Sequence, residues 1–380
     1  MTRYTVGLVF DSSLDTADGV SQYVMAVGRW LSEAGHDVHY LVGQTKRRDL
    51  QNINSLSRNV SVRFNQNRIS TPLPASSRKI KELLARERFD VLHIQMPYSP
   101  LLAGKIILAA SPQTAVVGTF HIAPYSALVH GGNRLLGVLV RRSLHRFDEV
   151  ISVSKPAAAF VKATFHMDSS LVPNTRYLDD FYNARPFPAL AKKQNIVFLG
   201  RLVERKGCQF LLHALTYMVR HQIIDRTTCH VLICGSGPLE LSLKRYVAMH
   251  QLEDLVDFKG FISEADKPRY LASADIVAYP STGGESFGIV LLEAMAASRG
   301  AVIAGNNPGY AAVLAEHHEA LFDPKDSRQF AELLAQLLAD RTTRQAAVGW
   351  QRAMAHHYDI DRVGPQILSI YRRALHKRPA

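Results

Sequence analysis

Two carboxylates, Glu285 and Glu293, lie eight residues apart in the segment 283–297, which reads GGESFGIVLLEAMAA. Paired glycines free the backbone before a helix expected to begin near Phe287, and the first amides of a helix have no partner inside it. Such a terminus attracts phosphate. Because a carboxylate repels bare phosphate, the segment favours a ligand with hydroxyl donors beside its phosphates. The simpler interpretation makes Glu285 a helix cap and Glu293 a solvated residue.

Three further segments could contact an anionic ligand. The loop GRLVERKG, residues 200–207, places Arg201 and Lys206 after an expected strand, where two cations could clamp a diphosphate and neutralise its charge as it leaves. Gly19 precedes a second expected helix, and His121 follows another strand. A solvated basic loop and a buried, satisfied histidine are the plainer alternatives. Combined with the carboxylates, these segments favour a nucleotide sugar as the ligand.

Short β-branched runs alternate with helical patterns in both halves of the chain, which predicts α/β layering around parallel sheets. The segment 173–194 interrupts this alternation with Pro, Asn and charged residues. We therefore expect two doubly wound domains, 1–173 and 190–358, with ligand in a deep cleft at the carboxyl ends of the strands. The expected strands are 5–10, 37–43, 90–95, 114–120, 149–154, 195–201, 229–237, 256–261, 275–281 and 300–305.

Composition and charge restrict the class of protein. The 45 Lys and Arg against 33 Asp and Glu give a net charge of +12, which calls for an anionic partner. The basic residues are not interleaved with aromatics, which disfavours nucleic-acid binding. No apolar stretch suits a membrane span and no signal-peptide pattern is visible, so a cytoplasmic location is expected. The three cysteines lack metal-ligand spacing and no DxD segment presents a metal pair, so we expect no obligatory cofactor and no metal.

The order and spacing of these segments resemble the retaining GT-B glycosyltransferases of family 4 over nearly the whole chain. The resemblance rests on Gly19, His121, GRLVERKG, CGSGPLE (234–240) and the two carboxylates of GGESFGIVLLEAMAA. It implies two Rossmann-like domains, a first that binds acceptor and a second that binds nucleotide sugar, with a final helix at about 361–380 that packs back on the first. The likeness is greatest to bacterial enzymes that transfer mannose from GDP-mannose to a membrane phospholipid.

The resemblance also implies residue roles. Arg201, Arg205 and Lys206 hold the donor diphosphate, and the backbone of Gly19 approaches it. Glu285 and His121 contact the transferred sugar, Glu293 takes the ribose hydroxyls, and Ile262 and Lys267 lie by the base. The amides that line the diphosphate belong to Ser286, Phe287, Gly288 and Ile289. This chain departs from the family with Asp18 before Gly19, where a second glycine is frequent, and with Thr175 after Pro173 and Asn174, where the family often has glycine.

The acceptor prediction depends on residues 46–88, which hold 11 Lys or Arg and three acids. An amphipathic helix is expected there, with Arg78, Lys79 and Lys81 beside its apolar face, and it could dock on anionic lipid at the inner face of the cell membrane. An ordinary sheet-covering helix is the alternative. By resemblance, Asn65 and Arg68 contact the acceptor, a phospholipid or lipid-linked glycan.

No convincing carboxylate nucleophile is present for double displacement, so the expected mechanism is front-face attack assisted by the leaving phosphate. Three other functions stay open. A UDP-sugar hexosyltransferase acting on a lipid or cell-envelope glycan would use the same residues. A nucleotide-sugar epimerase would need acid and base groups at the sugar ring, and a non-catalytic nucleic-acid binder would explain only the charge.

Overall fold

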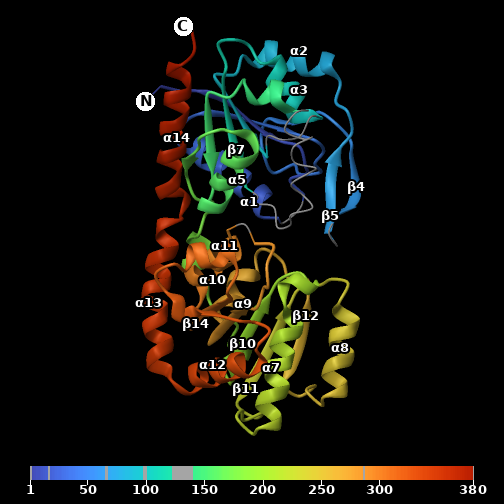
Figure 1. Ribbon diagram of the computed structural model, residues 1–380, viewed down its shortest axis with the longest axis vertical. Coiled ribbons are helices and arrows are strands. Elements are labelled where there is room, and N and C mark those ends of the chain that lie inside the picture. Colours follow the sequence, from blue (N-terminus) through green and yellow to red (C-terminus); the bar gives the residue numbers. More distant parts are fainter. Residues whose placement is uncertain are drawn as a thin grey trace. The chain divides into compact units, whose positions relative to one another are not determined.

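The computed structural model describes residues 2–15, 18–64, 67–96, 101–121, 140–285 and 287–379, without the side chains of 61–64 and 67–71. The chain divides into two compact units (Figure 1). Unit 1 comprises Met1–Tyr177 with Tyr358–Ala380, and unit 2 comprises Leu178–His357. Each is built on a parallel sheet with helices on its faces, which confirms the predicted α/β class.

Unit 1 contains a seven-stranded parallel sheet in the order β3-β2-β1-β6-β7-β8-β9, and a separate antiparallel pair, β4-β5. The C-terminal helix α14 belongs to this unit, although it follows unit 2 in the sequence. The elements are β1 Thr5–Phe10, α1 Gly19–Glu33, β2 Asp37–Val42, β3 Ile53–Ser55, β4 Asn59–Phe64, β5 Asn67–Pro72, α2 Ser77–Glu87, β6 Val91–Gln95, α3 Leu102–Ala109, β7 Ala115–Phe120, β8 Glu149–Ser152, α5 Lys155–Phe165, β9 Ser170–Leu171 and α14 Ile360–His376.

Both faces of the unit 1 sheet are buried, which explains why its strands are continuous apolar runs. Leu8 of β1 packs with α1 and α14 in one cluster, while its neighbour Val9 packs with α2 and α3 in another. Alternate side chains of a strand point to opposite faces, so one strand serves both clusters. Gly364 lets α14 lie close to α1, since a Cβ there would fall 2.5 Å from the Trp30 ring.

Unit 2 has a six-stranded parallel sheet in the order β12-β11-β10-β13-β14-β15. Its strands are β10 Gln194–Leu199, β11 Cys229–Cys234, β12 Val256–Gly260, β13 Ile276–Tyr279, β14 Ala301–Gly305 and β15 Leu321–Phe322. Its helices are α6 Asp179–Tyr182, α7 Cys208–Arg220, α8 Glu240–Met249, α9 Lys267–Ala272, α10 Ile289–Ala297, α11 Pro308–Val313, α12 Ser327–Ala339 and α13 Arg341–His357, with 3₁₀ turns η1 Pro188–Leu190, η2 Glu204–Lys206 and η3 His318–Ala320.

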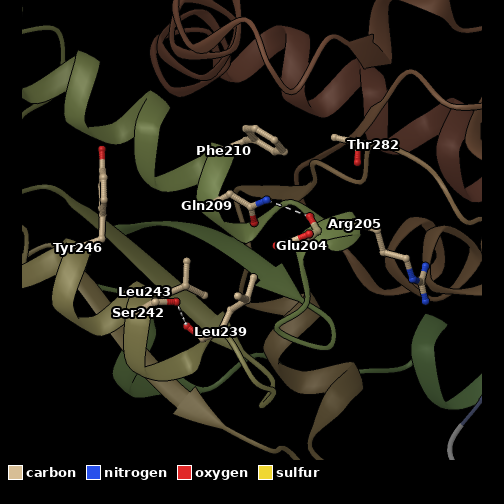
Figure 2. A pocket seen from close by; sticks show the side chains of 9 residues that line it. All are labelled: Glu204, Arg205, Gln209, Phe210, Leu239, Ser242, Leu243, Tyr246 and Thr282. Carbon is tan, nitrogen blue, oxygen red and sulfur yellow. Dashed lines mark hydrogen bonds between the residues drawn. The ribbon is translucent and has the colours of Figure 1, made fainter. Parts of the chain in front are cut away.

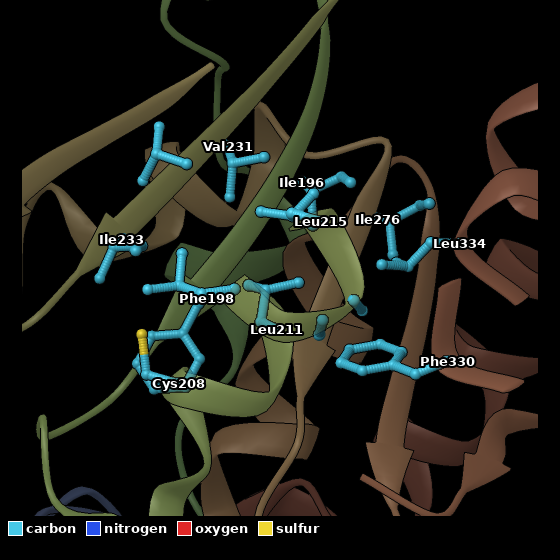
Figure 3. Close-up of a cluster of buried hydrophobic side chains, with 14 of the residues drawn as sticks. Ile196, Phe198, Cys208, Leu211, Leu215, Val231, Ile233, Ile276, Phe330 and Leu334 are labelled. Atoms are coloured by element: carbon cyan, nitrogen blue, oxygen red, sulfur yellow. The ribbon is translucent and has the colours of Figure 1, made fainter. Parts of the chain in front are cut away.

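The main core of unit 2 lies between this sheet and helices α7, α8 and α12 (Figure 3). Phe198 of β10, Leu211 of α7 and Phe330 of α12 are among its fully buried members. Outside this core, α10 packs against both α9 and α13, and α13 also contacts β14. This core fixes β10 and β13 as direct parallel neighbours in the middle of the sheet.

The strands expected from the sequence are present, most within two residues of the expected bounds, although β11 ends three residues early, at Cys234. The antiparallel pair β4-β5 was not among the expected strands, because both strands mix polar, basic and apolar residues. Helix α10 begins at Ile289, two residues after the expected start. No helix in the described residues combines the length and apolar character needed to cross a membrane.

Candidate functional site

Two loops meet at the carboxyl ends of β10 and β13. The loop 200–207 follows β10 and the loop 280–288 follows β13. The Arg205 carbonyl accepts hydrogen bonds from the Ser281 hydroxyl and the Thr282 amide, both at 2.9 Å. Gly207 has φ +75°, and a Cβ there would lie 1.8 Å from the Pro280 carbonyl oxygen, so only glycine permits this approach. The sheet order therefore holds both predicted ligand loops together.

Glu285 lies at the centre of a charge cluster between these loops. Its Oε1 accepts hydrogen bonds from Arg205 Nη1 at 2.9 Å and Ser281 Oγ at 3.2 Å, and forms an ion pair with Lys206 Nζ at 2.8 Å. Only 9% of Glu285 is exposed. The cap interpretation of Glu285 is wrong, because Gly288 is the N-cap of α10 and no side chain caps it. Two cations around one carboxylate leave the cluster with a net positive charge.

The protonation state of Glu285 follows from this pairing. Burial alone raises the pKa of the Glu285 carboxyl, but the charges of Lys206 and Arg205 and the hydrogen bonds outweigh it and hold the pKa below its usual value of 4.5. The carboxylate is therefore ionised at neutral pH. An ionised carboxylate only accepts hydrogen bonds, so it suits a ligand hydroxyl.

The other predicted phosphate ligands differ in how far they are buried near this cluster. Arg201 is exposed in the same loop, whereas Arg205 and Lys206 are partly buried against Glu285. Of the three cations predicted to hold the diphosphate, Arg205 and Lys206 both contact Glu285. Gly288 has φ +97°, and Phe287 and Ile289 are buried beside it, so the start of α10 is fixed by packing. Ser286 lies outside the described residues.

Glu293 is the second carboxylate, one turn into α10, and only 1% of it is exposed. The interpretation of Glu293 as a solvated residue is therefore wrong. Its Oε1 lies 3.3 Å from Nζ of Lys267, the first residue of α9, and this nitrogen also lies 2.8 Å from Glu264 Oε1. Ile262 is half-buried in the loop before α9. The sequence-predicted Glu293, Lys267 and Ile262 thus belong to α10, α9 and the loop that joins β12 to α9.

A pocket of about 590 Å³ lies beside the loop 200–207 (Figure 2). Its walls come from η2, the first turn of α7, α8 and Thr282. Arg205 is its one sequence-predicted residue, and Figure 2 shows this side chain extending away from Gln209 and Phe210. The Arg205 guanidinium is engaged by Glu285 and by the Gly284 carbonyl at 3.2 Å. The pocket is thus a neighbour of the Glu285 cluster and shares one residue with it.

In unit 1, the predicted phosphate-binding terminus at Gly19 is already occupied. Oδ1 of Asp18 accepts hydrogen bonds from the amides of Val20 at 3.0 Å and Ser21 at 2.9 Å. Asp18 is therefore the N-cap of α1, a position where aspartate is strongly preferred. A phosphate at this terminus has to displace the Asp18 carboxylate from these amides. The N-cap preference was the sequence signal that could have revealed this.

His121 is buried in unit 1, with 2% exposed. Its Nδ1 lies 3.0 Å from Asn174 Oδ1 and its Nε2 lies 2.8 Å from Gln95 Oε1. Burial lowers the pKa of His121 to about 4, so the ring is neutral at pH 7. The ring is thus buried between two amide side chains, as the plainer alternative of a buried histidine expects. Contact between His121 and a sugar requires one of the two amides to give way.

The predicted acceptor region is described only in part. Asn65 lies outside the described residues, and Arg68 lies in β5 with its backbone alone described. Arg78, Lys79 and Lys81 are exposed on α2, while Ile80 and Leu83 of the same helix are buried in the core under the sheet. Helix α2 is thus a sheet-covering helix that also presents a basic outer surface.

Among the described residues, no group of three or more His, Cys, Asp or Glu could hold a metal ion. The three cysteines are free and buried. Burial raises the pKa of the Cys229 thiol to about 12, so at neutral pH it behaves as a small apolar side chain.

Solved structures of glycosyltransferases share this architecture. A glycosyltransferase from Rickettsia africae superimposes with a TM-score of 0.77, covering 99% of each chain at 16% identity. Anabaena HepE in complex with UDP-glucose gives a TM-score of 0.70, covering 97% of this chain and 99% of the other at 17% identity. The two parallel-sheet units therefore have the GT-B fold, and glycosyltransferases of this fold use nucleotide-sugar donors.

The chain belongs to glycosyltransferase family 4. The model described as Glycosyltransferase Family 4 matches residues 17–176, and that described as Glycosyl transferases group 1 matches residues 182–349. A phosphatidyl-myo-inositol mannosyltransferase from Mycolicibacterium smegmatis is 30% identical over 96% of this chain and 93% of its own length. Another from Propionibacterium freudenreichii is 32% identical over 96% and 94%. The resemblance inferred from the sequence is confirmed, and the protein is a transferase.

Proposed function

We propose that the protein is a retaining mannosyltransferase that moves mannose from GDP-mannose to a phospholipid or lipid-linked glycan at the inner face of the cell membrane. The observation that carries the proposal is the buried Glu285 cluster with Arg205 and Lys206 at the carboxyl ends of β10 and β13. The names of the relatives, which are 30% and 32% identical over nearly the whole chain, support the mannosyl and lipid parts.

The cluster suits the departure of a diphosphate. Arg201, Arg205 and Lys206 hold the phosphates and stabilise the negative charge that develops when the bond to the sugar breaks. The amides at the start of α10 add partial positive charge on the same side of unit 2. Glu285 keeps the two cations in place before the donor arrives and accepts hydrogen bonds from sugar hydroxyls afterwards. Glu293, held by Lys267, takes the ribose hydroxyls.

The leaving phosphate assists deprotonation of the attacking hydroxyl, so the transfer retains configuration at the sugar without a protein nucleophile. In this proposal unit 2 binds the nucleotide sugar, and unit 1 binds the acceptor through Arg68, Asn65 and the basic surface of α2. Asp18 leaves the amides of α1 when phosphate reaches Gly19. An epimerase would release nucleotide from GDP-mannose without any acceptor, whereas the proposed transferase needs one.

Thermal denaturation with nucleotide sugars tests the donor. At a hundredfold excess over its Kd, GDP-mannose is expected to stabilise the protein by about 2.7 kcal/mol. UDP-glucose at the same concentration is expected to give a much smaller shift. Tighter binding of UDP-glucose would show that the donor is a UDP-hexose and not GDP-mannose. Stabilisation by neither would contradict nucleotide-sugar binding, and free GDP and UDP serve as controls for the base alone.

Vesicle binding tests the acceptor side. The triple variant Arg78→Ala, Lys79→Ala, Lys81→Ala removes three exposed cations of α2, each worth about 1 kcal/mol near an anionic surface. Its partition onto phosphatidylinositol-containing vesicles is expected to fall about 100-fold, with a raised acceptor KM. The control Arg142→Ala, Lys155→Ala, Lys162→Ala removes the same charge from other exposed positions of unit 1. Equal losses in both variants would show that net charge alone governs docking.

A further inference from the structure

The two nitrogens of the His121 ring have partners that one neutral tautomer does not satisfy. As placed, the two ring nitrogens both face amide oxygens, Asn174 Oδ1 at 3.0 Å and Gln95 Oε1 at 2.8 Å. A neutral imidazole has one N–H and can donate to only one of these oxygens. At the other nitrogen, two lone pairs would then face each other in a buried site, which is unfavourable.

An imidazolium ring would satisfy both oxygens, but the environment opposes it. His121 is buried, and within the described part of the chain no charged side chain is among the groups that shift its pKa. Its titratable neighbours among the described residues are Tyr23 of α1, whose ring lies edge-on at 4.8 Å, and His93 of β6. Burial raises the pKa of Tyr23 and lowers that of His93 to about 3, so both are neutral at pH 7. One of the two amides must therefore present its nitrogen to the ring.

Gln95 is the amide that can exchange its two ends without losing a bond. Its Nε2 is buried and has no hydrogen-bond partner within the part of the chain that the structure describes. Gln95 itself is fully buried at the last position of β6. The neighbouring parallel strand β7 ends just before His121, so both residues lie at the same edge of the sheet. Exchanging the amide ends turns the lone-pair contact into a hydrogen bond from Gln95 Nε2 to His121 Nε2. Oxygen and nitrogen of an amide are distinguished by such networks alone.

We propose that Gln95 is a positioning residue that donates its amide N–H to Nε2 of neutral His121, while Nδ1–H of the ring donates to Asn174. Nε2 is then the acceptor of the ring, and Gln95 stands where a substrate hydroxyl donates when it binds. This assigns to the buried His121 a defined tautomer and a defined ligand-facing nitrogen. The role of this nitrogen in catalysis rests on the proposed function, whereas the assignment of the tautomer does not.

Nitrogen NMR of the imidazole tests the tautomer without any substrate. In the full-length wild-type protein at pH 7, Nε2 of His121 is expected to give the signal of a non-protonated nitrogen and Nδ1 that of a protonated one. Gln95→Glu places an acceptor-only carboxylate against the ring and is expected to raise its titration midpoint by about 1–3 pH units. Gln95→Met, similar in size, is expected to keep the ring neutral but to lose the single tautomer.

Two results would overturn the proposal: a protonated Nε2 in the wild type, or a Gln95→Glu variant whose His121 titrates as in the wild type. If Gln95→Glu does not fold, the wild-type spectrum alone decides. Kinetics then report on the role. The acid limb of the kcat/KM profile is expected to move to higher pH in Gln95→Glu but not in Gln95→Met, which a merely structural role would not produce. The NMR test needs no substrate, so it still decides the tautomer if the protein does not transfer mannose.

Discussion

Replacing Glu285 with Gln is expected to lower kcat by roughly 10²–10³-fold, the effect of removing one preorganised electrostatic contact. Glu285 keeps Arg205 and Lys206 close together and offers the acceptor for sugar hydroxyls. Without its charge, the two cations bind phosphate at least as tightly, so affinity for free GDP is expected to persist or rise. Steady-state kinetics and calorimetric titration of GDP separate these two effects.

The same substitution is expected to destabilise unit 2 by about 1–3 kcal/mol, because it leaves two partly buried cations without their carboxylate. The pKa of Glu285 is lowered from 4.5, so its stabilisation is present above pH 4.5 and is lost as the pH falls through the lower folded value. Glu285→Gln should therefore flatten the loss of stability in acid. The control Glu332→Gln breaks an exposed pair with Arg328 and is expected to change stability by less than about 0.5 kcal/mol. Wild-type kcat in Glu285→Gln would contradict the role of the cluster.

Replacing Lys267 with Met is expected to destabilise unit 2 by about 3–5 kcal/mol and to weaken nucleotide binding. Lys267 Nζ lies 3.3 Å from Glu293 Oε1, and the Glu293 side chain is only 2% exposed. Removing the cation deprives the buried Glu293 carboxylate of this ion pair, which is far less favourable than removing both partners. Denaturant unfolding measures the stability, and GDP titration measures the binding.

The double variant Lys267→Met, Glu293→Gln is expected to recover most of the lost stability but not the nucleotide affinity, because the ribose-binding carboxylate is gone. A double-mutant cycle isolates this coupling. Glu264→Gln is the matched control, since Glu264 pairs with the same lysine from an exposed position. Its expected effect is below about 1 kcal/mol. Equal destabilisation by Glu264→Gln and Lys267→Met would show that the exposed pair, not the buried one, stabilises this region.

Most strands of the two sheets could be predicted because they are continuous apolar runs, and burial on both faces of a parallel sheet requires that pattern. The short strands β3, β9 and β15 were not among the expected strands. The pair β4-β5 escaped prediction because Asn59–Phe64 and Asn67–Pro72 mix polar, basic and apolar residues within a basic segment. Such strands are defined by their pairing with each other, and pairing is not visible in local composition. The cap at Asp18 was predictable, since the residue adjoins the helix that it caps.

By itself the sequence determined the fold class and the family and suggested the residues of the candidate donor site, because apolar runs, glycine turns and the spacing from Glu285 to Glu293 are local features. Only the tertiary structure decided which charges meet. Arg205 and Glu285 are 80 residues apart in the chain, yet they touch because β10 and β13 are neighbours in the sheet. Gln95 and Asn174 likewise reach His121 from distant segments. The packing of the whole domain selects the strand order, and the strand order brings these partners together. The position of each charge, and the partner of each ring nitrogen, follow from that order.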